Sequence, residues 1–123
     1  MRRIQIIAGG KRFNTLFETV TEHRAAGSRL AQLIVEEEFN GEVYLDRDAK
    51  AFHRILQWLR DGLPIVVLSN MEKDRLFFEL KWYGPFNSEE PVVITEKEYS
   101  SWKIICEVNS GPSPIKISLG RHC

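Results

Sequence analysis

The segment from Ala49 to Gly62 carries the strongest periodic pattern in this 123-residue sequence. Its apolar side chains recur at the i, i+3, i+4, i+7 spacing that places them on one face of a helix. They are Phe52, Ile55, Leu56 and Leu59. Asp48 is a natural N-cap and Gly62 a natural stop, so we expect a long helix that buries this face in a core. Trp58 lies beside the stripe, where it either widens the buried face or packs against another molecule.

A short alternating run from Glu42 to Asp46 precedes this helix and predicts a strand. The charged triplet Asp46-Arg47-Asp48 joins the two elements. Successive side chains of a strand point to opposite faces, so the triplet cannot converge locally on a cation or a substrate. We expect it to cap the helix and to form charge-assisted hydrogen bonds, either within the subunit or across a subunit boundary.

The first forty residues predict a hairpin followed by two modest helices. Alternating runs flank Gly9-Gly10, which is a hairpin signal, and the residues after the glycines still have the pattern of a strand rather than of a phosphate-binding loop. Thr15 is positioned to cap a short helical turn, and Ser28 to cap a second helix. On that second helix Leu30, Leu33 and Ile34 share one face.

The second half predicts another core helix and then a change of pattern. We expect a helix that begins at Ser69 or Asn70 and ends at Gly84-Pro85. Its core side should carry Leu76, Phe77, Leu80 and Tyr83. Beyond Pro91 the sequence has three strand-like runs, which are 92–95, 102–108 and 115–119. About 33 residues are too few for an independent core, so this extension must pack on the first part, pair with another chain or remain partly mobile.

Composition excludes several classes of protein. Seventeen basic residues balance seventeen acidic ones, so the electrostatic attraction that nucleic acids and anionic lipids require is missing. The longest apolar run, LPIVVL, is far shorter than the roughly 20 residues that cross a bilayer. We therefore expect no nucleic acid partner, no membrane insertion and a cytoplasmic location, with the nucleus as the alternative.

No catalytic constellation is legible in the sequence. The three histidines, His23, His53 and His122, are scattered, and the two cysteines, Cys106 and Cys123, form no metal half-site. We interpret both cysteines as free thiols and predict no catalytic residue, no metal site and no cofactor. The remaining alternative in this class is a small enzyme or metal-binding protein that uses His122 and the two cysteines.

The order of these features resembles the BTB/POZ domain in its potassium-channel tetramerisation subtype, which also occurs in soluble KCTD proteins. The likeness extends from about Arg3 to Phe86. Its motifs here are strand, Gly-Gly, strand, then F-x-T at Phe13 and Thr15, Y-L-D-R-D at 44–48, the long-helix positions up to Arg60, and W-Y-G at 82–84. The resemblance implies an α+β fold, with a small three-stranded sheet and about five helices in residues 1–88. Residues 89–123 would be a β-rich or partly mobile extension.

The resemblance also implies a function. Members of this family are non-catalytic assembly modules that form homo-tetramers or homo-pentamers through polar contacts, and many soluble ones are adaptors for a cullin-RING ubiquitin ligase. We accordingly expect this chain to bind itself, with a cullin scaffold as a further partner. Its oligomer interface should include Asp46, Arg47, Asp48 and Arg60. The alternative within the family is the cytoplasmic assembly domain of a voltage-gated potassium channel.

Overall fold

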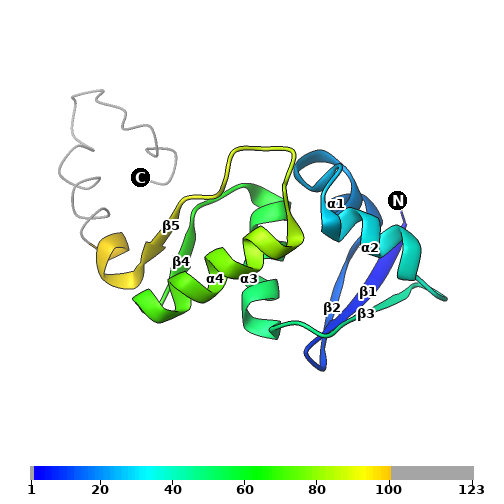
Figure 1. Ribbon diagram of the computed structural model, residues 1–123, viewed down its shortest axis with the longest axis horizontal. Coiled ribbons are helices and arrows are strands. Elements are labelled where there is room, and N and C mark those ends of the chain that lie inside the picture. Colours follow the sequence, from blue (N-terminus) through cyan, green and yellow to red (C-terminus); the bar gives the residue numbers. More distant parts are fainter. Residues whose placement is uncertain (1, 101–123) are drawn as a thin grey trace.

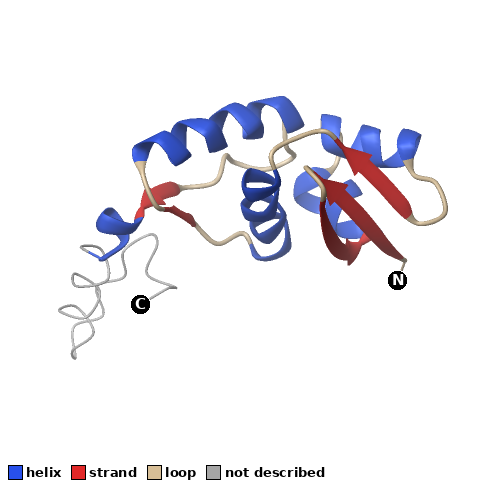
Figure 2. Cartoon of the chain, turned by 90° about the horizontal axis from the view of Figure 1, so that it is seen from below, coloured by secondary structure: helices blue, strands red, loops and turns tan. Residues whose placement is uncertain are grey.

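The computed structural model describes residues 2–100, in which one helix, α3 (Ala49–Asp61), lies between two small sheets (Figures 1 and 2). One end of the molecule carries a three-stranded sheet of β1 (Arg3–Ala8), β2 (Lys11–Leu16) and β3 (Glu42–Leu45). The other end carries β4 (Ile65–Val67) paired with β5 (Val93–Thr95). The remaining helical elements are α1 (Phe17–Thr21), the 3-10 helix η1 (His23–Ala25), α2 (Arg29–Glu37) and α4 (Asn70–Tyr83). This α+β architecture confirms the fold expected from the sequence.

The three-stranded sheet has the order β2-β1-β3. β1 pairs with β2 in antiparallel register, with Ile6 opposite Phe13, and with β3 in parallel register, with Ile6 opposite Val43. Gly9 and Gly10 form the predicted hairpin, both at positive φ. Because β1 is central and alternates, Ile4, Ile6 and Ala8 are buried in the core.

Helix α3 fills the centre of the core, as its periodicity predicts. Phe52, Ile55, Leu56 and Leu59 are all at most 4% exposed, and each such burial contributes about 2 kcal/mol to folding. Gly62 ends the helix in the left-handed conformation, with φ of 71°. Trp58 is 3% exposed, and its ring lies edge-on to that of Phe86 at a centroid distance of 5.2 Å. Trp58 therefore widens the buried face.

Two local predictions are wrong. Thr15 does not cap α1; it lies inside β2 opposite Ile4, and the N-cap position of α1 is Leu16, which offers no side-chain oxygen. On α4, Leu76, Leu80 and Tyr83 are buried as predicted, but Phe77 is 40% exposed. Glu79 is buried on that helix instead, because it pairs with Arg47 of the triplet.

The segment after Pro91 begins by packing on the rest of the molecule. Val93 to Thr95 form β5, which pairs in parallel with β4, and Val93 belongs to the core cluster. Residues 96–100 continue as a helical turn. The other two predicted strand-like runs, 102–108 and 115–119, lie outside the described residues. The same holds for both cysteines and for His122.

Candidate functional site

Asp48, the last residue of the triplet, is the N-cap of α3. Its carboxylate oxygen accepts a hydrogen bond from the Ala51 N–H over 2.8 Å, which confirms the predicted cap. Such a cap satisfies one of the free N–H groups of the first helical turn and stabilises a helix by about 1 kcal/mol. The Asp48 side chain therefore serves the start of α3.

Arg47 reaches across to α4. Its Nε donates to Glu79 Oε2 over 3.1 Å, and its second terminal nitrogen donates to the same oxygen. Its guanidinium carbon also lies 4.2 Å from the centre of the Trp82 ring. The Glu79 side chain is only 4% exposed and that of Arg47 23%, so the pair is largely removed from water. This is the charge-assisted contact expected of the triplet, formed within the subunit.

Asp46 is exposed and lines a hollow of about 670 Å³. The hollow is also lined by Lys11, Lys50, Arg75 and Phe78, together with Arg47, Asp48 and Glu79. Among residues 2–100, Asp46 forms no hydrogen bond or ion pair, and Phe78 is 64% exposed. We call Lys11, Asp46, Lys50, Arg75 and Phe78 the triplet surface.

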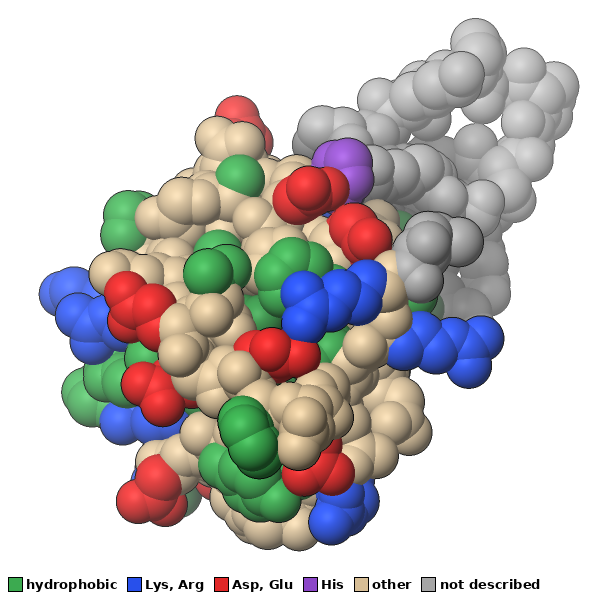
Figure 3. Space-filling view, turned by 90° about the vertical axis from the view of Figure 1, so that its right-hand side faces the viewer, with side chains coloured by type: hydrophobic (Ala, Val, Ile, Leu, Met, Phe, Trp, Pro, Cys, Tyr) green, Lys and Arg blue, Asp and Glu red, His purple; other side chains and the backbone are tan. Residues whose placement is uncertain are grey.

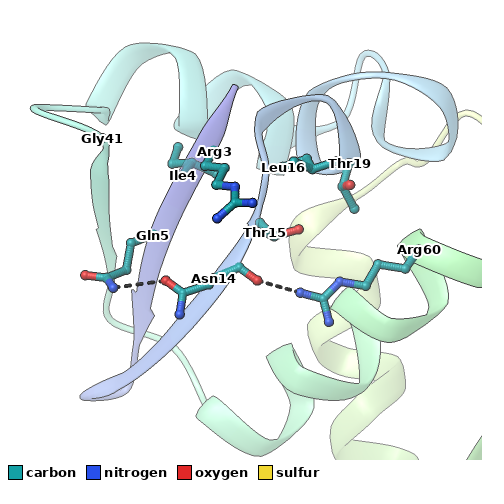
Figure 4. Close-up of a pocket in the computed structure, with 9 residues that line it drawn as sticks. All are labelled: Arg3, Ile4, Gln5, Asn14, Thr15, Leu16, Thr19, Gly41 and Arg60. Carbon is teal, nitrogen blue, oxygen red and sulfur yellow. Dashed lines mark hydrogen bonds between the residues drawn. The ribbon is translucent and has the colours of Figure 1, made fainter. Parts of the chain in front are cut away.

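Arg60, the fourth predicted residue, does not lie on the triplet surface. It is exposed in the last turn of α3, whereas the triplet precedes the first, so the length of the helix, about 18 Å, separates them. One of its terminal nitrogens donates to the backbone carbonyl of Asn14 on β2 over 2.7 Å (Figure 4). The structure thus brings Asp46, Arg47 and Asp48 to one end of α3 and places Arg60 at the other.

Sequence reasoning missed Glu79 as the partner of Arg47. The signal was present, because Glu79 follows Leu76 by three residues and precedes Tyr83 by four, which puts a carboxylate on the buried side of a helix. A buried carboxylate needs a cationic or hydrogen-bonding partner. Arg47, the arginine of the strand–helix junction, supplies that cation.

Glu72 organises the neighbouring part of α4. Burial by itself would raise the pKa of Glu72, but the Leu68 N–H and the charge of Arg54 outweigh it, and the pKa lies below its ordinary value. Glu72 accepts from Leu68 over 2.9 Å and from the Arg54 Nε over 2.5 Å. Arg54 thereby ties α3 to the start of α4, next to the exposed side chains of Leu68 and Met71.

Two further searches concern residues 2–100. No three histidine, cysteine or carboxylate side chains gather there in a way that could hold a metal ion. Within the same residues, none of the helices combines the length and the apolar character that crossing a bilayer requires.

The sequence profile of the BTB/POZ domain matches residues 4–89, a range that contains every residue of the triplet surface. The chain belongs to the BTB/POZ family. Within it, this BTB domain is of the potassium-channel tetramerisation type, as its motifs indicated. BTB domains are generally non-catalytic interaction modules that self-associate and bind other proteins.

One relative of this BTB protein is named FH protein interacting protein FIP2, from Arabidopsis thaliana. The two are 34% identical over 101 residues. The alignment covers 77% of the present chain and 33% of the relative, so the chain spans about a third of the relative's length. Together with the family, this name supports a role in protein interaction.

Proposed function

We propose that this BTB protein is a homo-oligomerisation module that assembles into a tetramer or pentamer through polar contacts. The observation that carries the proposal is the triplet surface, where an unpaired carboxylate, Asp46, lies among three basic side chains and beside the exposed ring of Phe78. Mixed charges around an exposed aromatic ring suit a protein partner, in which charges fix orientation and the ring provides buried area.

The separation of Arg60 from the triplet supports a closed ring. A ring of identical subunits needs two different surfaces on each copy, so that the first surface of one copy meets the second surface of the next. The triplet surface and the surface around Arg60 lie at opposite ends of α3 and fit these two parts. In this arrangement Asp46 and Arg60 are contact residues, whereas Arg47 and Asp48 act mainly by holding the triplet surface in shape.

The test is the absolute mass in solution, measured by light scattering for the wild type and for Asp46→Arg. Asp46 forms no hydrogen bond or ion pair within residues 2–100, so its reversal should leave the fold intact and lower the mass. Asp74→Arg is the matched control, because Asp74 is also exposed and lies on α4. A wild type that stays monomeric at high concentration would overturn the proposal, and so would an unchanged mass for Asp46→Arg.

We further propose that the assembled module is an adaptor that presents a substrate to a cullin-RING ubiquitin ligase. Support comes from a surface apart from the two ring surfaces. Leu68 and Met71 are 61% and 82% exposed there, beside a hollow of about 350 Å³. Exposed apolar side chains next to a hollow are typical of protein-binding sites. Capture of a purified cullin N-terminal domain by the wild type, and its loss in Leu68→Asp/Met71→Asp, is the expected result.

The alternative is the cytoplasmic assembly domain of a potassium channel. The open reading frame distinguishes the two, because a channel must continue into several apolar segments of about 20 residues each. For the adaptor we propose a cytoplasmic location, with the nucleus as the other compartment, which imaging of the tagged full-length protein tests.

A further inference from the structure

The small sheet of β4 and β5 is built almost entirely of aliphatic side chains. With the residues that flank the strands, the sequences are Pro-Ile-Val-Val-Leu at 64–68 and Pro-Val-Val-Ile-Thr at 91–95. The two strands are parallel. Parallel strands with continuous apolar runs are typical of sheets that are covered on both faces. The sequence of this pair therefore predicts a covering layer on each side.

One face of the pair is covered within residues 2–100. Helices α3 and α4 pack against the two strands, and Figure 2 shows α4 along one side of them. Ile65, Val67 and Val93 are at most 6% exposed and belong to the core cluster. These three side chains form the inner face of the sheet.

The opposite face carries the side chains of the alternate residues. Val66 lies opposite Ile94 in the strand register, and both are only partly buried. The alternation of burial continues to Leu68, one residue after β4, and to Val92, one residue before β5, which are 61% and 42% exposed. We call Val66, Leu68, Val92 and Ile94 the outer face. It is an aliphatic surface without a charged member.

Carboxylates flank the outer face along the chain. Glu89 and Glu90 precede Val92, Glu96 follows β5, and all three are exposed. None of these three side chains has a hydrogen bond or ion pair within residues 2–100. A segment that covers the outer face should therefore combine apolar side chains with basic ones.

The chain itself continues with a segment of this character. Residues 101–123 contain two runs with an apolar side chain at every second position, which are 102–108 and 115–119. They carry three basic residues and one acidic residue. The segment follows the helical turn 96–100, so it is attached about 8 Å from the end of β5. A tethered segment has a high effective concentration at a surface next to its point of attachment.

We propose that residues 101–123 cover the outer face, with the apolar sides of their two runs on its aliphatic side chains and their basic residues beside the three carboxylates. Removal of the aliphatic side chains from water drives the contact, and the charges fix its position. Leu68 also belongs to the proposed cullin surface, so the segment and a cullin would compete for it. The inference depends neither on the adaptor role nor on self-association.

The experiment attaches a nitroxide to Cys123 of the full chain, in a Cys106→Ala background that removes the other thiol. Cys123 lies outside both runs, so the label does not occupy their apolar sides. The readout is the intensity of the methyl NMR signals of the outer face, before and after the nitroxide is reduced with ascorbate. We expect these signals to be lost before reduction and to return after it. Val35 is an exposed valine on α2, at the far end of the molecule, and should keep its intensity throughout.

Val92→Asp tests whether the outer face itself holds the segment. Replacing a covered aliphatic side chain with a charge should shift the ratio of docked to undocked segment by about tenfold and restore most of the Ile94 intensity. Val35→Asp is the matched control, because it places the same charge on an exposed valine elsewhere, and it should leave the loss unchanged. Ile94→Thr keeps the β-branched shape and provides the same test, read at Val66, if Val92→Asp does not fold.

Three results would overturn the proposal. Signals of the outer face that keep their intensity in the wild type would leave this face to another protein. A loss as strong in the folded outer-face variant as in the wild type would mean that the tether alone brings the label near. The third uses a mixture of isotope-labelled chains without nitroxide and nitroxide-bearing chains without isotope. The same loss in that mixture would mean that a second copy supplies the segment.

Discussion

Gly9 lies against the backbone of Arg47 so closely that a β-carbon on Gly9 would be 2.7 Å from the Arg47 carbonyl oxygen. The Gly9 N–H also donates to the Leu45 carbonyl over 3.1 Å. The tip of the first hairpin is therefore fitted to the triplet, and this contact fixes where Asp46 and Arg47 lie relative to Lys11.

We expect Gly9→Ala to destabilise the fold by about 3 kcal/mol, because it combines a left-handed backbone conformation with a steric clash. Gly10→Ala is the control. Gly10 also has a positive φ, of 85° against 54° for Gly9, but a β-carbon there meets nothing within 4 Å, so only the conformational cost of about 1 kcal/mol applies. Urea denaturation midpoints measure both, and equal losses would mean that the fit between hairpin and triplet contributes nothing.

A second prediction concerns the Arg47–Glu79 pair. Arg47→Met leaves the buried Glu79 carboxylate without its cation and should reduce the free energy of unfolding by about 3 kcal/mol. The double variant Arg47→Met/Glu79→Leu removes the charge as well and should recover most of that loss, since well-packed apolar replacements of buried pairs are often neutral. Denaturation of the two variants under one buffer condition decides it, and a double variant as unstable as the single one would contradict the argument.

The same pair explains why Asp46, rather than Arg47, is the residue for testing assembly. A change at Arg47 disturbs the interior between β3 and α4 before it alters any contact with another copy. Asp46 has no such internal partner within residues 2–100. Reversing the charge of Asp46 therefore breaks no internal pair, and a change in mass reports on contacts between subunits.

The sequence predicted the elements whose patterns are local. The stripe of α3, the caps at Ser28 and Asp48 and the Gly9-Gly10 hairpin depend on spacings of a few residues, and the structure has all of them. The capping of α1 was misjudged because Thr15 continues the alternation of β2, and strand pairing with Ile4 outweighs the preference of threonine for a helix start.

Long-range pairings were harder to derive. Glu79 lies 32 residues from Arg47, and no periodicity links two positions that meet only through the packing of α4 against the strand–helix junction. Sequence patterns also grouped Arg60 with the triplet because all belong to one motif. The length of α3 separates them in space. Figure 3 views the end of the molecule that carries the three-stranded sheet. Acidic, basic and apolar side chains are interspersed on this face, an arrangement that composition cannot reveal.

A third prediction follows from the lowered pKa of Glu72. A carboxyl whose folded pKa is depressed binds fewer protons in the folded state, so its stabilising contribution is complete above the unfolded pKa, about 4.5, and is lost as the pH falls through the folded value. We expect Glu72→Gln to lower the thermal midpoint at pH 7 and to flatten its decline below pH 4.5. Glu37→Gln, at an exposed position of α2, should leave both unchanged. Parallel pH profiles for the wild type and Glu72→Gln would contradict this account.

A fourth prediction concerns the hydroxyl of Tyr83, which is fully buried and has no hydrogen-bond partner within residues 2–100. Burial, reinforced by the nearby Glu79 carboxylate, raises the pKa of Tyr83 well above its ordinary value of 10.0. Above that pH the unfolded chain can release this proton while the folded chain retains it, so stability falls as the pH rises. Tyr83→Phe removes both the unpaired hydroxyl and the titration. It should be at least as stable as the wild type at pH 7, and denaturation between pH 9 and about pH 11 should show a shallower loss of stability. A variant that is clearly less stable at pH 7 would show that the hydroxyl has a stabilising partner.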